Sequence, residues 1–356
     1  MDIQDPFVNP DFKFLYGKDS TLHVVGIEPE FTDEGIQMSI YQRDPETDRV
    51  TSFQKPFYPF FLLDSVGRLQ GFDRSRYMYQ SLKGDNKYKA LVAFRHWSDY
   101  TDAMKHIYVD QNHEIPEPDE DGKRSWDWGK IHGLERPGSL TTAFQIQSGI
   151  TFFGGMTTDD VVRMQLDIET YTEHSFPNAE REEDYVTIIT MTTNREDEIV
   201  WYVDNPKASR PSKIKQITGA TEVRRFQDEK HMLSELGEKI MRVDPDVIEG
   251  HNIFRFDLDY IIKRCRLHDV DFKVGRKEES CQRWGSGRTF AEKDIDYPMC
   301  AIGGRSVIDT WFLCMAYDQY ARDMPGHGLK DAAKYFETEG GDGDADGREY
   351  VEGSKI

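Results

Sequence analysis

Residues 166–170 read LDIET, a stretch in which apolar and acidic side chains alternate. Residues two apart on a β-strand point to the same side. A strand here would direct Asp167 and Glu169 to one face, while Leu166 and Ile168 enter the core. Two carboxylates this close repel each other unless cations lie between them, which makes a divalent-metal site physically reasonable. Two solvated acids near a strand end would give the same pattern, so this stretch alone leaves both interpretations open.

A third acid follows in the stretch VIEGHNIFRFD at residues 247–257. It reads as a short buried strand, a polar turn and an acid in the first turn of a helix, where the helix dipole favours the negative charge of Asp257. Asp257 would complete a metal site from a second element, although acids are also common at helix starts for structural reasons. Asn252 is equally compatible with an ordinary turn residue.

The sequence around these two stretches predicts an α/β domain. Strands are expected at 164–168, 185–193, 198–203 and 247–250, and helices at 228–240, 257–267, 310–317 and 329–336. The first of these helices has Asp228 in the capping position and apolar residues at helical spacing behind it. Strands followed by helices around a mixed sheet indicate the α/β class.

Residues 1–155 are predicted to form a separate, β-rich α+β domain, which leaves residues 156–356 for the α/β domain. A strand is expected at 21–27, and the alternation of Ile36, Met38 and Ile40 predicts a second, half-buried one. The aromatic run at 55–63 contains Pro56 and Pro59, so it suits an edge strand better than the centre of a sheet.

The composition is that of a folded chain that stays in the cytoplasm. Apolar residues make up 37% of the 356 residues and aromatic residues 12%, which is enough to bury a core. No run approaches the ~18 apolar residues of a membrane span, and the N-terminus lacks the regions of a signal peptide. No two of the four cysteines form a CxxC motif, so neither a disulfide scaffold nor a zinc ribbon is a good interpretation of this sequence.

The net charge of −20 is unfavourable for a protein that binds nucleic acid, because an acidic surface repels phosphates at long range. Three explanations remain open. In the first, bound cations neutralise the carboxylates of a metal cleft. In the second, the whole surface is acidic because the protein is adapted to high salt. In the third, the basic parts that bind DNA lie outside this chain.

Taken in order, these segments resemble the N-terminal and exonuclease domains of family B DNA polymerases. LDIET and the stretch from Asn252 to Asp257 resemble the first two exonuclease motifs, D-x-E and N-x-x-x-F-D. GRSVIDT at 304–310 resembles the strand-to-helix segment after the exonuclease hairpin, and HGLKDAAKYF at 327–336 resembles the next helix. The aromatic run at 55–63 resembles part of the N-terminal domain. The resemblance is dense from 164 to 336 and thin before that.

The resemblance implies an RNase H-like exonuclease fold of the DEDD superfamily. Such a domain proofreads DNA synthesis by hydrolysing the 3′-terminal phosphodiester with two Mg²⁺ or Mn²⁺ ions. By residue, Asp167 would bridge both metals, Glu169 would bind the metal that activates water, and Asp257 would hold the other metal. Asn252 and Phe256 would position the single-stranded 3′ end of the primer, although Phe256 is equally compatible with a core position.

The same resemblance implies that the remainder of a polymerase chain, with its palm, fingers and thumb, is the main protein partner. A membrane partner is not expected, and the chain is expected to be a monomer.

The family's third exonuclease motif, Y-x-x-x-D, is missing from the sequence. Four residues after Tyr317, Tyr320, Tyr335 and Tyr350 stand Ala321, Met324, Glu339 and Ser354. We therefore expect a truncated polymerase whose isolated exonuclease domain cuts slowly or not at all.

Two alternatives remain. One is a stand-alone nuclease of the DEDD type, with a fourth ligand from Asp309, Asp331 or Glu339. The other is a catalytically silent nucleic-acid-binding module, against which the presence of all three acids argues. The acidic, glycine-rich segment 337–347 partly matches a calcium loop, but Gly353 stands where the bidentate glutamate belongs, so a surface loop is the better interpretation.

Overall fold

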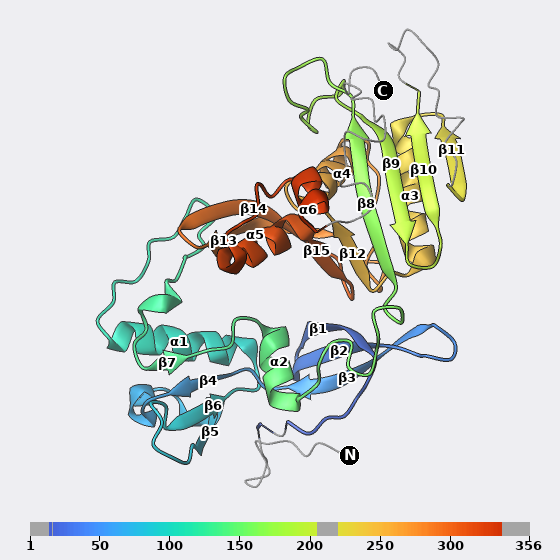
Figure 1. The fold of residues 1–356 in the computed structure, drawn as a ribbon. Helices are drawn as coiled ribbons and strands as arrows, with labels where there is room; N and C mark the ends of the chain where they lie inside the picture. The colour runs from blue at the N-terminus through green and yellow to red at the C-terminus, as the bar shows by residue number, and fades with distance from the viewer. Residues whose placement is uncertain (1–13, 16, 205–219, 337–356) are drawn as a thin grey trace. The chain divides into compact units, whose positions relative to one another are not determined.

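The structure is a computed structural model that describes residues 14–15, 17–204 and 220–336 (Figure 1). The chain divides into two compact units, Met1–Met156 and Thr157–Ile356. The calcium-like segment, Glu339 and Tyr350 lie outside the described residues.

The first unit contains two antiparallel sheets. One has the strand order β1-β2-β3 and the other the order β5-β6-β4-β7. The strands of the first sheet are β1 (Val24–Thr32), β2 (Gly35–Arg43) and β3 (Val50–Phe57). The second sheet contains β4 (Phe60–Leu63), β5 (Met78–Ser81), β6 (Ala90–Ala93) and β7 (Leu134–Glu135). Two helices accompany them, α1 (Trp97–Asp110) and α2 (Leu140–Ser148).

The predicted strand at 55–63 is two strands. Its first part belongs to β3, which lies at the edge of its sheet as expected, whereas β4 lies between β6 and β7. Pro59 has no amide hydrogen to donate and stands between the two strands, where its carbonyl accepts from the amide of Phe94 at 3.0 Å. The prediction of an edge strand is therefore correct for β3 and wrong for β4.

The alternation predicted for β2 holds only in part. Ile36, Met38 and Ile40 are buried as expected. Ser39, on the opposite face, is also only 1% exposed, and its hydroxyl donates to the carboxylate of Glu30 on the neighbouring strand β1. Both faces of β2 are thus covered, and the strand is more deeply buried than its sequence indicates.

The second unit is built on a mixed sheet of six strands in the order β11-β10-β9-β8-β12-β15, which confirms the predicted α/β class (Figure 1). Strand β9 runs antiparallel to β8 and β10, and the other neighbours are parallel. The six strands are β8 (Arg163–Thr170), β9 (Val186–Thr193), β10 (Glu198–Val203), β11 (Glu222–Phe226), β12 (Val247–Gly250) and β15 (Ser306–Asp309).

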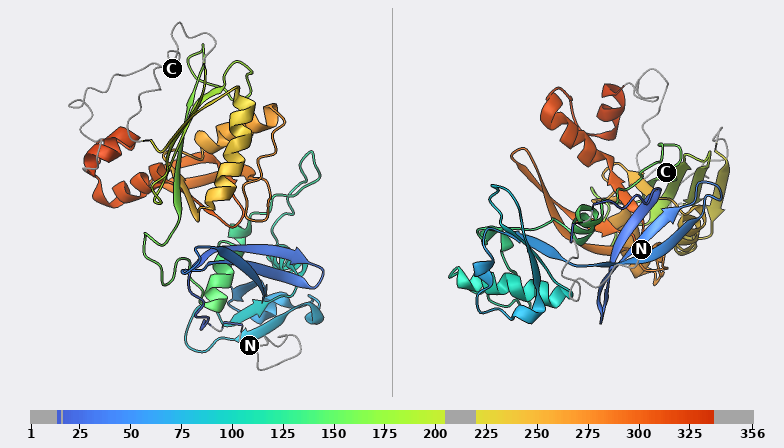
Figure 2. Two further views of the ribbon diagram at one scale, coloured as in Figure 1. Left: turned by 90° about the vertical axis from the view of Figure 1, so that its right-hand side faces the viewer. Right: turned by 90° about the horizontal axis from the view of Figure 1, so that it is seen from below.

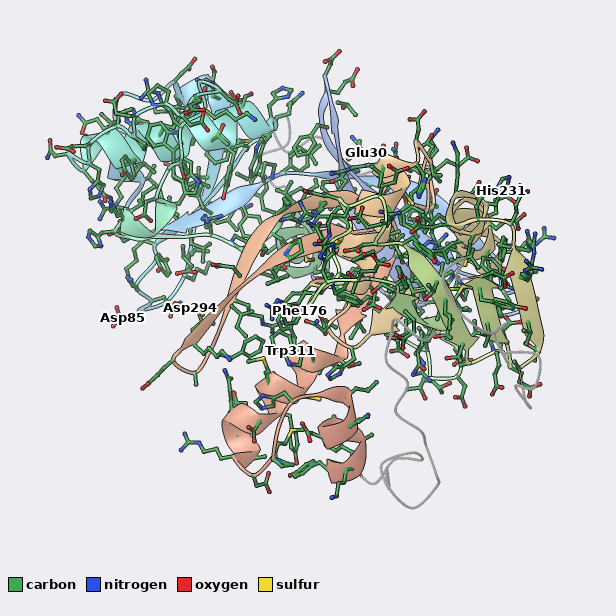
Figure 3. All side chains as sticks on the ribbon, turned by 90° about the horizontal axis from the view of Figure 1, so that it is seen from above. Glu30, Asp85, Phe176, His231, Asp294 and Trp311 are labelled. Carbon is green, nitrogen blue, oxygen red and sulfur yellow. The ribbon has the colours of Figure 1, made fainter. Side chains whose placement is uncertain are left out.

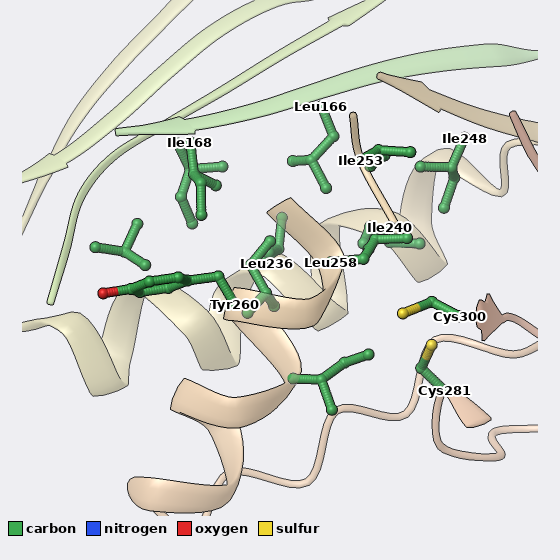
Figure 4. Packing of buried hydrophobic residues seen from close by; sticks show 14 of the residues in the cluster. Leu166, Ile168, Leu236, Ile240, Ile248, Ile253, Leu258, Tyr260, Cys281 and Cys300 are labelled. Atoms are coloured by element: carbon green, nitrogen blue, oxygen red, sulfur yellow. The ribbon is translucent and has the colours of Figure 1, made fainter. Parts of the chain in front are cut away.

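Two helices, α3 (Glu229–Val243) and α4 (Asp257–Leu267), cover one face of this sheet, as the left view of Figure 2 shows. The Asp228 side chain caps α3 by accepting from the amide of His231 at 2.9 Å, as predicted. Leu166 and Ile168 of β8 pack against residues of both helices, Leu236 of α3 and Leu258 of α4 among them, in one buried apolar cluster (Figure 4). This core fixes β8 and α4, the two elements that carry the three acids.

A long hairpin and two further helices complete the second unit. The hairpin is formed by β13 (Gln282–Phe290) and β14 (Lys293–Ala301). The helices are α5 (Thr310–Ala321) and α6 (Leu329–Tyr335), close to the predicted positions. All four cysteines are buried and free of disulfides. Among the described residues, none of the helices has the length and apolar character needed to cross a bilayer.

Candidate metal centre

Strand β8 presents its two acids as the sequence predicts. Burial alternates along the strand, with Met164, Leu166 and Ile168 in the core and Asp167 and Glu169 exposed on the opposite side. A strand in this register places both carboxylates on the sheet face that α3 and α4 do not cover.

Asp257 is the first residue of α4, and its side chain is 2% exposed. Its Oδ1 accepts a hydrogen bond from the backbone amide of Ile168 at 3.1 Å. That amide belongs to the residue between Asp167 and Glu169. Two residues 89 positions apart in the sequence therefore meet here, and the three predicted acids lie in the same region of the sheet.

The electrostatics of the three acids follow from this arrangement. Burial raises the pKa of Asp167, and burial together with the charge of Asp167 raises the pKa of Glu169. Burial is also the main reason that the pKa of Asp257 rises to about 7, with the charge of Asp167 adding to it and the Ile168 amide partly opposing it. The charge of Asp167 thus raises the pKa values of both other carboxylates.

Asp167 and Glu169 reach solvent, yet their pKa values rise because surrounding protein atoms limit their hydration. Asp167 lines a cavity of about 380 Å³. None of the three carboxylates forms an ion pair with a base among the described residues, and no basic side chain is among the main influences on their pKa values. The protein therefore concentrates negative charge here without compensating it.

This donor set suits a hard divalent cation, although it is not a closed cage. In the described part of the chain, no three His, Cys, Asp or Glu side chains stand close enough together to hold a metal ion by themselves. Mg²⁺ commonly binds through one or two carboxylates and keeps waters and substrate phosphates as its other ligands. Uncompensated carboxylates with raised pKa values fit such a partly open site.

Asn252 lies in the turn between β12 and α4 with a positive φ of 66°. Its amide donates to Asp309 Oδ1 at 2.8 Å, while its own buried side-chain Oδ1 has no hydrogen-bond partner among the described residues. An unsatisfied buried oxygen is costly, so it marks a place where a ligand would supply a donor. Phe256 is half-buried against the core, with its ring 5.5 Å from that of Tyr260, so both interpretations of Phe256 remain.

Asp309 is 3% exposed, and its carboxylate is occupied by backbone amides. It accepts from Asn252 at 2.8 Å, Phe254 at 3.4 Å and Trp311 at 2.9 Å, so it caps α5 and holds the turn that carries Asn252. Burial raises its pKa, and these amides lower it. Asp331 is exposed on α6 and does not line the cavity beside Asp167.

Sequence reasoning missed two residues that line this cavity with Asp167, namely Glu249 and His251. Glu249 lies opposite Gln165 in the β8–β12 register, and Gln165 shares a strand face with Asp167. The parallel pairing of these two strands was the missing information. His251 lies 3.1 Å from the hydroxyl of Thr310 and 2.9 Å from the carbonyl of His327, which joins the turn to α5 and to the segment before α6.

Comparison with known proteins defines the class of this unit. Residues 149–320 match the model of the DNA polymerase family B exonuclease domain. The DNA polymerase of Archaeoglobus fulgidus is 25% identical over 142 residues, which cover 40% of this chain and 15% of that protein. DNA polymerase 120R of Invertebrate iridescent virus 3 is 31% identical over 153 residues, or 41% of this chain and 13% of its own length.

The fold agrees with these sequence matches. The family B DNA polymerase of Pyrobaculum calidifontis superimposes with a TM-score of 0.59 at 14% identity, over 94% of this chain and 41% of that chain. Residues 149–320 are therefore a family B DNA polymerase exonuclease domain, and the chain as a whole, including the region before this domain, shares its fold with part of the solved polymerase. It spans less than half the length of the solved polymerase and a smaller share of the two curated relatives.

Proposed function

We propose that the second unit is a proofreading 3′→5′ exonuclease that hydrolyses the terminal phosphodiester of a DNA strand. The observation that carries this proposal is the convergence of Asp167, Glu169 and Asp257 without a compensating base, inside a domain of the matching family. We further propose that the two units are the N-terminal and exonuclease domains of a DNA-directed DNA polymerase, whose palm, fingers and thumb are their partners.

In this proposal the three carboxylates hold two Mg²⁺ or Mn²⁺ ions. Asp167, Glu169 and Asp257 would each supply carboxylate oxygens to the ions, and the charge of Asp167 acts on both other acids. Bound divalent cations would stabilise negative charge on the phosphate and lower the pKa of the attacking water. Asp257 approaches this region from the helix start, held there by the Ile168 amide.

The turn between β12 and α4 would hold the substrate's 3′-terminal nucleotide. Asn252 would use its unpartnered Oδ1 to accept from that nucleotide, and Phe256 would contact its base or sugar with the exposed part of its ring. Stacking of a base on an aromatic ring does not depend on sequence, which suits the removal of any mispaired nucleotide.

The direct test is metal binding. Titration calorimetry with Mn²⁺ should detect binding to the wild-type chain and a loss of affinity of about 100-fold or more in the Asp167→Ala/Glu169→Ala variant, since both ions lose a ligand. The matched control is Glu117→Ala/Glu120→Ala, which removes two exposed acids from a loop of the first unit. Equal Mn²⁺ affinity in the wild type and the β8 variant would reject the metal assignment.

A further inference from the structure

Two arginine side chains lie over one group of aromatic rings in the second unit. The group, here called the aromatic cluster, consists of Trp311 and Phe312 of α5 and Phe290 of β13. Ring centroids are 5.4 Å apart for Trp311 and Phe312 and 5.5 Å for Phe312 and Phe290. The guanidinium of Arg255 lies 5.2 Å from the Trp311 ring, and that of Arg288 lies 5.1 Å from the Phe290 ring and 5.9 Å from the Phe312 ring.

The aromatic cluster lies next to the turn of the candidate metal centre. Arg255 belongs to that turn, where its amide donates to the carbonyl of Asn252 at 3.1 Å, and Asp257 follows two residues later. Trp311 lies where α5 approaches the β13–β14 hairpin (Figure 3), and its amide is held by Asp309. The hairpin brings Arg288 to the same rings from a distant part of the sequence.

Both guanidinium groups are exposed, and neither forms an ion pair with a carboxylate among the described side chains. Another arginine of β13 behaves differently, since Arg283 is paired with Asp259. Arg255 and Arg288 therefore keep their N–H groups available although the chain carries a net charge of −20. A guanidinium stacked on a ring loses little further freedom when its edge binds an anion.

We propose that Arg255 and Arg288 bind backbone phosphates of the single strand whose 3′ end enters the carboxylate site. This inference rests on the proposed exonuclease function and adds a substrate-binding surface to it. Phosphates are the expected contact because Phe290 and Phe312 are only 5% and 3% exposed and cannot stack on bases. Binding through phosphates is independent of sequence and weakens as salt rises.

The test uses the full chain and a fluorescently labelled oligothymidylate of twelve nucleotides, in buffer with EDTA so that the strand stays intact. Fluorescence anisotropy would give its affinity at several salt concentrations for wild type and for Arg255→Gln, Arg288→Gln and the double variant. For single strands the slope of log affinity against log salt changes by about 0.7 for each phosphate contact. We expect each substitution to reduce the slope by about that amount and to weaken binding on the order of tenfold at 50 mM salt.

Two further variants separate charge from folding. Arg255→Lys/Arg288→Lys keeps both charges and should retain most of the salt slope. Arg242→Gln removes an exposed arginine from the last turn of α3 and should leave binding unchanged.

An unchanged slope in the double glutamine variant would overturn the inference, as would equally tight binding of a blunt duplex or no binding by the wild type. The proposed exonuclease function is judged separately, by Mn²⁺ binding at Asp167 and Glu169.

Discussion

The Asp257→Asn variant should be more stable than the wild type in metal-free buffer at pH 8, and it should also lose Mn²⁺ affinity. Asparagine keeps an oxygen that accepts from the Ile168 amide but carries no charge. In the wild type, burial and the charge of Asp167 oppose ionisation of Asp257, whose pKa rises to about 7. The ionised carboxylate is therefore a cost to the folded state that asparagine removes.

The pH dependence of this effect follows from the sign of the shift. A carboxyl group whose pKa is higher in the folded state binds more protons there than in the unfolded chain, so stability falls as pH rises. The loss begins above the ordinary value of 3.8 and is complete above about pH 7. A shift of this size corresponds to a destabilisation on the order of 2–4 kcal/mol at pH 8.

Thermal unfolding of both proteins in EDTA between pH 4 and pH 8 checks this prediction. The Tm of Asp257→Asn should exceed that of the wild type by about 5 °C or more at pH 8, and the difference should shrink towards pH 4. Added Mn²⁺ should raise the wild-type Tm and narrow the gap, because a ligand that binds only the folded state stabilises it. A variant that is less stable than the wild type at pH 8 would contradict the electrostatic account of this site.

The Arg264→Met variant should lose about 3–5 kcal/mol of stability in the second unit. Arg264 of α4 is 1% exposed, and its Nη2 lies 2.6 Å from Oε2 of Glu229, which is 5% exposed. Its Nη1 also donates to the carbonyls of Arg181 at 2.6 Å and Ala179 at 3.2 Å. Methionine would leave the Glu229 carboxylate buried with only His268 and the Val186 amide as partners. It would also release the segment that connects β8 and β9, whose carbonyls Arg264 holds.

Urea unfolding followed by circular dichroism would measure this loss. The Glu229→Gln/Arg264→Met double variant has no buried carboxylate without its arginine partner. It should therefore be more stable than Arg264→Met alone. Hydrogen exchange of the Val186 amide, which donates to Glu229 at 2.8 Å, should accelerate in the single variant. A loss below about 1 kcal/mol would show that the Glu229–Arg264 pair is dispensable for the fold.

Sequence periodicity located β8 and α4 well because each buries one face against a single core. The alternation from Met164 to Ile168 and the apolar stripe of Leu258, Ile261 and Ile262 report that burial directly. The hairpin strand β13 is largely exposed and glycine-containing, so it carries no such pattern. Only the family resemblance indicated that a hairpin precedes β15.

The features of the site that could not be predicted from the sequence depend on contacts between residues far apart in the chain. Asp309 was considered as a metal ligand, and nothing in its neighbours shows that three amides, two of them from a turn more than fifty residues earlier, occupy its carboxylate. Likewise, Arg264 reads as a polar residue on an amphipathic helix, although it is buried against Glu229. Both outcomes depend on which segments fold together rather than on local pattern.

We propose that Asp167, Glu169 and Asp257 together form a divalent-metal centre. Anomalous X-ray diffraction from crystals of this chain grown with Mn²⁺ and a short single-stranded oligonucleotide tests it most directly. We expect Mn²⁺ peaks within about 2.5 Å of carboxylate oxygens of Asp167 and of at least one of the other two acids. Mn²⁺ bound elsewhere on the chain, with these three carboxylates unligated at saturating metal, would contradict it.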